Sequence, residues 1–307
     1  MIANFFKKTK PENVFNIVLL LFVYYLISLF LSNTEGFTVL IWVKKISFFL
    51  WLIFFLLSVN FIVKKNNLTQ DNLYALLIIV LLLGTFSEAM FFNRIIFTNI
   101  ALLLGFRKIY SLRTHSNTKK KLFDAGFWVG IAALIYSWSL FYLILIYIGI
   151  IAYRKLNIKN LFIPLIGFIM PVIIYFTYHF YFDSLSVFYD RFIFDYSLDF
   201  VSYNKFKILV PATFLLATIT WSIFSVTPKI VMVSNKLKFS WIVLLHHVSI
   251  SLLVVILSPI KNGSEMLFLI FPAAIIIANF IQKSGSVIFK NVVLYVFFAI
   301  SVVVYFL

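Results

Sequence analysis

Acidic side chains are the scarcest chemistry-bearing residues of this chain, and four of the ten lie within one stretch, residues 176–206. They are Asp183, Asp190, Asp195 and Asp199, and phenylalanine and tyrosine rings lie between them. Such carboxylates can bind a divalent cation, assist proton transfer or offer an acidic surface to a partner. Their spacing matches no defined set of metal ligands, so the sequence predicts no metal site here.

Two glutamates lie where apolar runs end. Glu35 follows the first run, in Asn33-Thr34-Glu35-Gly36, and Glu88 closes the third. Such a carboxylate is normally solvated, but one that faces a cleft between helices becomes a better base as water is removed. If the protein is an enzyme, the expected catalytic acids are Glu35, Glu88, Asp183 and Asp190, and the expected substrate contacts are Arg94 and Arg191.

Composition places these residues in a membrane protein. Of the 307 residues, 63% are hydrophobic and 12% are charged, against about 25% charged in soluble domains. One aqueous core cannot bury so much apolar surface. Basic cytoplasmic turns account for the net charge of +16, so we expect no nucleic-acid partner. Cysteine is absent, which excludes thiol catalysis and disulfides.

Apolar runs long enough to cross, or nearly cross, about 30 Å of hydrocarbon predict an all-α protein of about eleven transmembrane helices. They form a single transmembrane domain, 1–307. The run 122–153 is too long for one crossing, and we divide it at a turn at Tyr136–Ser139. The other runs are 14–32, 46–63, 72–88, 94–111, 161–180, 208–224, 240–257, 266–281 and 288–307.

Basic residues orient these helices, because Lys and Arg gather in cytoplasmic loops. With the N-terminus in the cytoplasm, most of the 26 Lys and Arg residues fall inside and most of the ten acids fall outside. This orientation puts the C-terminus of a multi-pass membrane protein on the outer side, away from the cytoplasm.

Residues 181–207 form the longest outer segment in this orientation. Drawn as one helix, they place apolar and aromatic side chains on one stripe from Phe182 to Phe200. We therefore expect an interfacial outer helix with its rings in the headgroup layer. The rings expected to dock a partner are Phe182, Tyr189, Phe192, Tyr196 and Phe200.

Other polar groups are assigned structural roles. His246 and His247 lie mid-span, so we expect them to face the interior and to bond a neighbouring helix. Asp124 is expected to pair with Arg107 or Arg113, which flank the same turn.

Two stretches resemble known families. The opening, KKTKPENVFNIVLLLFVYYLISLFL, and the middle, RKIYSLRTHSNTKKKLFDAGFWVGIAALIYSWSLFYLILI, look like an uncharacterised Bacteroidota family of multi-pass membrane proteins. This resemblance implies a protein of the bacterial inner membrane, so that the outer side, with the C-terminus, is the periplasm. The middle is also similar to the GT-C superfamily of polyprenyl-phosphate-sugar-dependent glycosyltransferases, through Leu122-Phe123-Asp124-Ala125-Gly126 and Gly130. The run from Glu265 to Pro272 resembles a late span of those enzymes. The resemblance implies a GT-C-like helix arrangement with Glu35 at the position of the catalytic acid, where Asp is usual.

Three functions follow from these features. The one we favour is a non-catalytic, degenerate GT-C-like subunit of a larger assembly for envelope biogenesis or protein export. Its partners are the lipid bilayer and other membrane or periplasmic proteins, and it needs no cofactor. The second is a periplasmic-face glycosyltransferase that uses a divalent cation and a polyprenyl-phosphate donor. The third is a lipid or small-solute transporter. The sparse outer acids and short loops favour the first.

Overall fold

The structure is a computed structural model that describes the chain apart from residues 1, 32–38, 92, 115 and 234. The described residues form helices and no β-strand. Within this described part of the chain, seven helices are long and apolar enough to cross a membrane, which confirms a multi-pass, all-α protein. They are Pro11–Leu31, Val39–Lys65, Arg94–Arg113, Ile158–Tyr181, Phe206–Met232, Leu237–Leu257 and Ser264–Lys283; shorter apolar helices are Tyr74–Thr85, Ser137–Ala152 and Val287–Val303.

The helix break predicted within 122–153 is present. Helix α6 (Thr118–Ile135) ends at Tyr136, whose φ of −144° and ψ of 106° are extended. The 3-10 helix η3 (Ser137–Phe141) and helix α7 (Tyr142–Ala152) follow. Each of the other predicted apolar runs also coincides with a helix.

The chain divides into two compact units, which are described separately. Unit 1 contains residues 1–93, 199–232 and 260–307, and unit 2 contains residues 94–198 and 233–259.

In unit 1, helices α4 (Tyr74–Thr85) and α12 (Leu267–Lys283) form the core. Every residue of α4 is buried, and α12 is buried from Leu267 to Ile281. A helix that is apolar all round is expected in such an interior position. Helix α4 packs against α12, α2 (Pro11–Leu31), α3 (Val39–Lys65) and α13 (Val287–Val303). Helices α3 and α10 (Phe206–Val233) expose many apolar side chains, as lipid-facing helices do.

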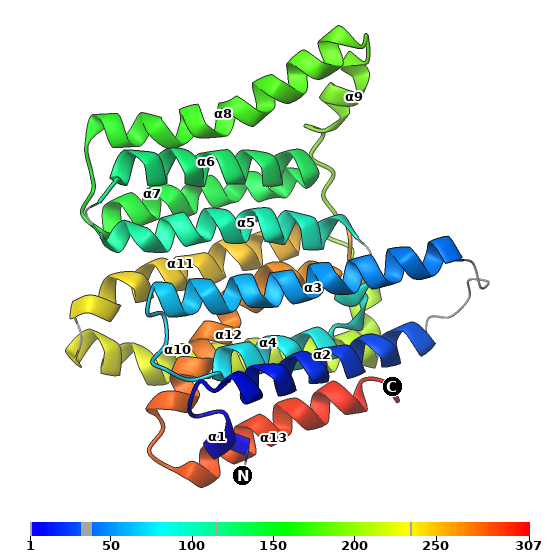
Figure 1. Cartoon of the computed structure of the whole chain (residues 1–307), viewed down its shortest axis with the longest axis vertical. Coiled ribbons are helices and arrows are strands. Elements are labelled where there is room, and N and C mark those ends of the chain that lie inside the picture. Colours follow the sequence, from blue (N-terminus) through cyan, green and yellow to red (C-terminus); the bar gives the residue numbers. More distant parts are fainter. Residues whose placement is uncertain (1, 32–38, 92, 115, 234) are drawn as a thin grey trace. The chain divides into compact units, whose positions relative to one another are not determined.

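In unit 2, α6 lies between α5 (Arg94–Tyr110) and α8 (Ile158–Tyr181) (Figure 1). Glycines allow α6 and α8 to touch through their backbones. A Cβ on Gly126 would lie 2.1 Å from the carbonyl oxygen of Pro164, and one on Gly130 would lie 2.6 Å from that of Phe168. Any side chain at these positions would push the two helices apart.

Helix α11 (Asn235–Leu257) is joined to the rest of unit 2 by tyrosine hydroxyls. The buried pairs are Tyr153–Ser240 at 3.0 Å, Tyr110–His247 at 3.0 Å, Tyr142–Ser251 at 3.0 Å and Tyr136–Ser258 at 2.6 Å. These bonds fix the register of α11, because shifting the helix would leave buried polar groups unpaired. His247 therefore has the interior role predicted for it. The same prediction is wrong for His246, which is exposed.

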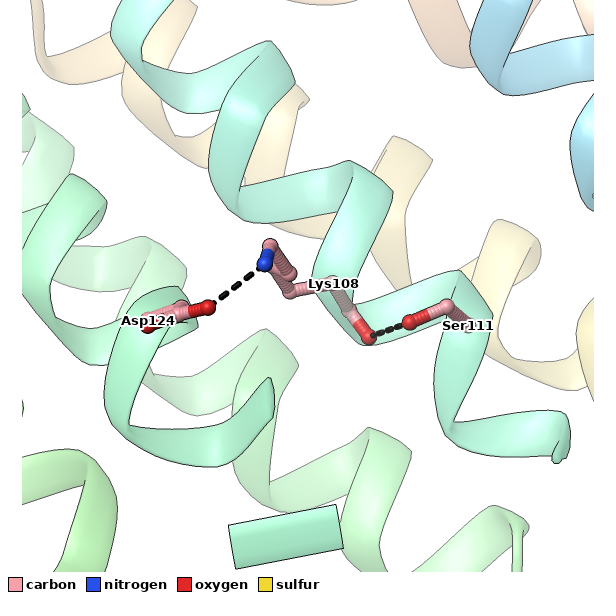
Figure 2. Close-up of polar contacts among 3 residues, drawn as sticks. All are labelled: Lys108, Ser111 and Asp124. Carbon is pink, nitrogen blue, oxygen red and sulfur yellow. Dashed lines mark hydrogen bonds and ion pairs between the residues drawn. The ribbon is translucent and has the colours of Figure 1, made fainter. Parts of the chain in front are cut away.

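Asp124 pairs with Lys108, a partner that the sequence did not predict for it. The Lys108 Nζ lies 2.5 Å from Asp124 Oδ2, and the Lys108 carbonyl accepts a bond from the Ser111 hydroxyl (Figure 2). Lys108 reaches Asp124 because α5 packs directly on α6.

The predicted interfacial helix over 181–207 is wrong. Between the end of α8 at Tyr181 and the start of α10 at Phe206, the segment contains only α9 (Leu185–Asp190) and the 3-10 helix η4 (Val201–Asn204). Within unit 2, η3 binds the backbone that follows α9: Ser137 Oγ donates to the Arg191 carbonyl at 2.7 Å, and Trp138 Nε1 donates to the Asp195 carbonyl at 2.8 Å. These side-chain bonds use carbonyls that a continuous helix would need.

Candidate functional site

A polar pocket of about 300 Å³ lies in unit 1, at the end of α4. Three segments surround it: the turn after α4 with the 3-10 helix η1 (Ser87–Met90), the chain leading into α10, and a turn before α12. Its lining residues are Thr85, Phe86, Ser87, Glu88, Ser202, Lys205, Lys207, Ile208, Asn262 and Gly263.

The charged residues of the pocket are two lysines and one glutamate. Lys205 is exposed, whereas Lys207 and Glu88 are half-buried. Ammonium groups form short, strong hydrogen bonds with phosphate or carboxylate oxygens. The Glu88 carboxylate can accept hydrogen bonds from a hydroxyl or amine of the same ligand. The pocket therefore suits an anionic group that carries a hydrogen-bond donor.

Glu265 lies behind the pocket and joins two of its walls. Its side chain is fully buried in the short 3-10 helix before α12. Tyr203 donates its hydroxyl to Oε1 at 2.5 Å, and the Gly263 amide donates to Oε2 at 2.9 Å. Tyr203 follows Ser202 in the chain, and both Ser202 and Gly263 line the pocket. The carboxylate thus holds the 202–205 wall against the 262–263 wall.

The turn at 262–263 depends on glycine. Gly263 has a φ of 98°, a left-handed conformation that residues with a Cβ adopt only under strain. Asn262 Oδ1 accepts bonds from the Ser264 amide at 3.1 Å and the Ser264 hydroxyl at 2.7 Å. This geometry aims the Gly263 amide at Glu265.

Lys261 lies beside this cluster. Only 7% of the residue is exposed, and its Nζ lies 4.6 Å from the centre of the Phe200 ring. Burial lowers the pKa of Lys261, and the nearby Glu265 carboxylate opposes that change. Burial and the same carboxylate raise the pKa of Tyr203, so Tyr203 keeps the proton that it donates.

Of the predicted catalytic residues, Glu88 lines the pocket. Glu35, the predicted reacting carboxylate, lies outside the described residues. In unit 2, Asp183 and Asp190 are exposed, and Asp183 has a φ of 49°.

The two predicted substrate arginines also belong to unit 2. Arg94 is exposed at the first position of α5. Arg191 is half-buried, and its Nε donates to the Tyr175 hydroxyl at 3.3 Å. Within the described part of the chain, no group of three or more His, Asp or Glu residues is placed to hold a metal ion.

The aromatic rings predicted to dock a partner are mostly exposed. The exposed fractions are 59% for Phe182, 60% for Tyr189, 66% for Tyr196 and 40% for Phe200, whereas Phe192 is half-buried. They are carried by irregular chain and short helices, not by one helical stripe.

Four residues of the pocket and its support were missed at the sequence level: Lys205, Lys207, Tyr203 and Glu265. The available signal was Glu265, a carboxylate at the start of the wholly apolar run Met266–Ala278. An acid placed there needs donors. The Gly263 amide is two positions away, but the Tyr203 hydroxyl is brought close only by folding.

A family model matches residues 4–307, and the chain belongs to the Family of unknown function DUF6427. No curated protein and no solved structure matches the chain.

Proposed function

For this member of DUF6427, we propose that the chain is a non-catalytic membrane subunit that holds a phosphate group in the polar pocket. The phosphate belongs to a lipid headgroup or to a small solute. The observation that carries the proposal is the cavity of about 300 Å³ lined by Lys205, Lys207 and the hydroxyl-bearing Ser87 and Ser202.

The size of the pocket limits its ligand. A volume of about 300 Å³ corresponds to roughly ten water molecules at about 30 Å³ each. It is at the small end of ligand pockets, with room for a phosphate and a compact polar substituent. Glu88 would accept hydrogen bonds from that substituent.

The exposed rings between Phe182 and Phe200 support the subunit part of the proposal. Exposed aromatic side chains are enriched where proteins associate. We place the subunit in an inner-membrane assembly for envelope biogenesis or export, with about eleven crossings, a GT-C-like scaffold and its N-terminus in the cytoplasm.

Phosphate binding is tested by calorimetry on the purified chain in detergent. The probes are inorganic phosphate and a short-chain phosphatidic acid, which separate a solute from a lipid source. We expect the double variant Lys205→Gln with Lys207→Gln to raise the Kd of the tighter-binding probe at least tenfold. The reason is that each charge-assisted bond contributes about 1.5–3 kcal/mol.

The matched control replaces Lys44 and Lys229, two exposed lysines of unit 1 outside the pocket. Equal loss of affinity in both double variants would mean that the change in net charge alone causes the effect. Unchanged affinity in the pocket variant would refute the proposed site.

A second candidate is the glycosyltransferase, favoured by the location of Glu88 in the same pocket as the two lysines. There Glu88 would act as base toward an acceptor hydroxyl while the lysines bind donor phosphate. If the purified chain transfers sugar from a polyprenyl-phosphate donor and Glu88→Gln abolishes transfer, the enzyme is correct. Stoichiometric partners in mild detergent without transfer favour the subunit.

A further inference from the structure

One end of unit 2 concentrates positive charge. It comprises the α5–α6 turn, the α7–α8 turn and the start of α11, which the Tyr153–Ser240 bond attaches to the end of α7. The cations there are Arg107, Lys108, Arg113, Lys119, Lys120, Lys121, Arg154, Lys155, Lys159 and Lys238. Unit 2 has one acid near this end, Asp124, and it pairs with Lys108. Its other acids, Asp183, Asp190 and Asp195, follow the far end of α8.

Helix packing brings the exposed lysines of this end together. Gly126 lies against Pro164, and Gly130 lies against Phe168. Both pairs are 38 positions apart, so α6 and α8 run parallel, and their first turns, which carry Lys119, Lys120 and Lys159, lie at the same end of unit 2. Neither helix has an acid in its first turn to offset the lysines.

The lysines at this end of unit 2 differ in their exposure and in their contacts. Lys119, Lys120 and Lys159 are exposed. Lys121 is half-buried and orders the turn, because its Nζ donates to the Ser111 carbonyl at 2.8 Å and to Thr114 Oγ1 at 2.6 Å. Arg154 lies over the Phe239 ring at 5.5 Å. The exposed lysines therefore lie beside a turn that hydrogen bonds of Lys121 hold in place.

Exposed apolar side chains continue from the lysines along α8. After Lys159, Phe162 is 59% exposed and Ile166 is 54% exposed. The order along the helix is ammonium first and hydrocarbon next, which matches the order of phosphate and acyl chain in a phospholipid. A soluble polyanion such as nucleic acid would leave this apolar surface without a partner.

We propose that this basic end is a docking surface for anionic phospholipids. The headgroup phosphates contact Lys119, Lys120 and Lys159, and the acyl chains lie against Phe162 and Ile166. Each Lys near a membrane surface favours anionic lipid by about fivefold. The site lies in unit 2 and does not depend on the pocket of unit 1.

Native mass spectrometry tests the proposal on the purified chain in mixed micelles of phosphatidylglycerol and phosphatidylcholine. The measured quantity is the ratio of bound phosphatidylglycerol to bound phosphatidylcholine. We expect Lys119→Gln, Lys120→Gln and Lys159→Gln together to lower this ratio at least tenfold, and added salt to lower it for the unmodified chain. A control triple variant, Lys7→Gln with Lys44→Gln and Lys229→Gln, removes equal charge from exposed sites on unit 1.

A lower lipid ratio in the variant of Lys119, Lys120 and Lys159, with little change in the control variant, supports the proposal. Equal loss in both variants, or none in either, overturns it and leaves the lysines as topology signals only. Since lysines also orient insertion, Ser186→Cys is added to both variants. Labelling of this exposed residue from the same side in each shows that orientation is unchanged.

Discussion

At the scale of single residues, Glu265 shows how a membrane protein keeps a carboxylate in an apolar interior. A buried charge is tolerated when donors satisfy it. Here the donors are the Tyr203 hydroxyl and the Gly263 amide. Both belong to turns beside the pocket, so the stability of the carboxylate and the shape of the pocket depend on the same two bonds.

Replacing Tyr203 by Phe removes one donor and leaves Oε1 unsatisfied. We expect the free energy of unfolding to fall by about 1–3 kcal/mol, measured by heat- or SDS-induced unfolding in detergent. Tyr295→Phe, at a ring that is 50% exposed, should change it by less than about 0.5 kcal/mol. Equal effects of the two substitutions would show that the bond to Glu265 does not stabilise the fold.

The same variant has a pH signature. Because burial and Glu265 raise the pKa of Tyr203, the folded state retains this proton more firmly than the unfolded state. The contribution of Tyr203 is therefore complete below about pH 10, the ordinary tyrosine pKa, and decreases as the pH rises above it. The stability difference between the unmodified chain and Tyr203→Phe should shrink in that range.

The Lys108–Asp124 pair differs from the buried Glu265–Tyr203 bond because it is partly exposed to water. Its side chains are 26% and 23% exposed, so water screens much of their attraction despite the short distance (Figure 2). A double-mutant cycle with Lys108→Met and Asp124→Asn should give a coupling energy below about 1 kcal/mol that weakens further with salt. A coupling of several kcal/mol, unaffected by salt, would contradict this.

At the scale of elements, the contact between α6 and α8 depends on glycine. Overpacking a tight interior costs about 1–3 kcal/mol, and the atoms nearest the missing Cβ are backbone atoms, which cannot rotate away. Gly126→Ala and Gly167→Ala, where the nearest oxygens lie at 2.1 and 2.2 Å, should each destabilise the chain by at least that amount. Gly285→Ala, with nothing within 4 Å, is the control, and a loss there as large as in α6 would contradict this explanation.

Helices were predictable where local pattern alone determines them. Uninterrupted apolar runs predicted the described helices, and the excess length of 122–153 predicted the break at Tyr136. The stripe from Phe182 to Phe200 failed as a predictor because η3 binds its backbone at Arg191 and Asp195. Those donors lie more than 50 positions away in the chain, so no local pattern reveals them. The pocket was missed for the same reason, because Lys205, Lys207 and Glu88 line one pocket only in the folded chain.

At the scale of the whole molecule, orientation can be tested directly because the chain has no cysteine. Ser116→Cys and Ser186→Cys place single thiols at exposed positions on either side of α6, α7 and α8. If each of these helices crosses, an impermeant maleimide added to intact cells labels Cys at 186 but reaches 116 only after permeabilisation. Labelling of both from the same side would mean an even number of crossings between them, and the reverse pattern would place the N-terminus outside.

Helix α4 is short for a membrane element, and this affects the energetics of the pocket. Its 12 residues rise only about 18 Å at 1.5 Å per residue, against about 30 Å of hydrocarbon. If α4 crosses the membrane, its flanking polar turns must cover the rest of that thickness, and one of them, η1, lines the pocket. An ion that enters the pocket would then cross part of the transmembrane electric field, where a full crossing is worth about 2.3 kcal/mol per charge at 100 mV. Occupancy of the pocket in a living cell would then follow membrane voltage as well as ligand concentration.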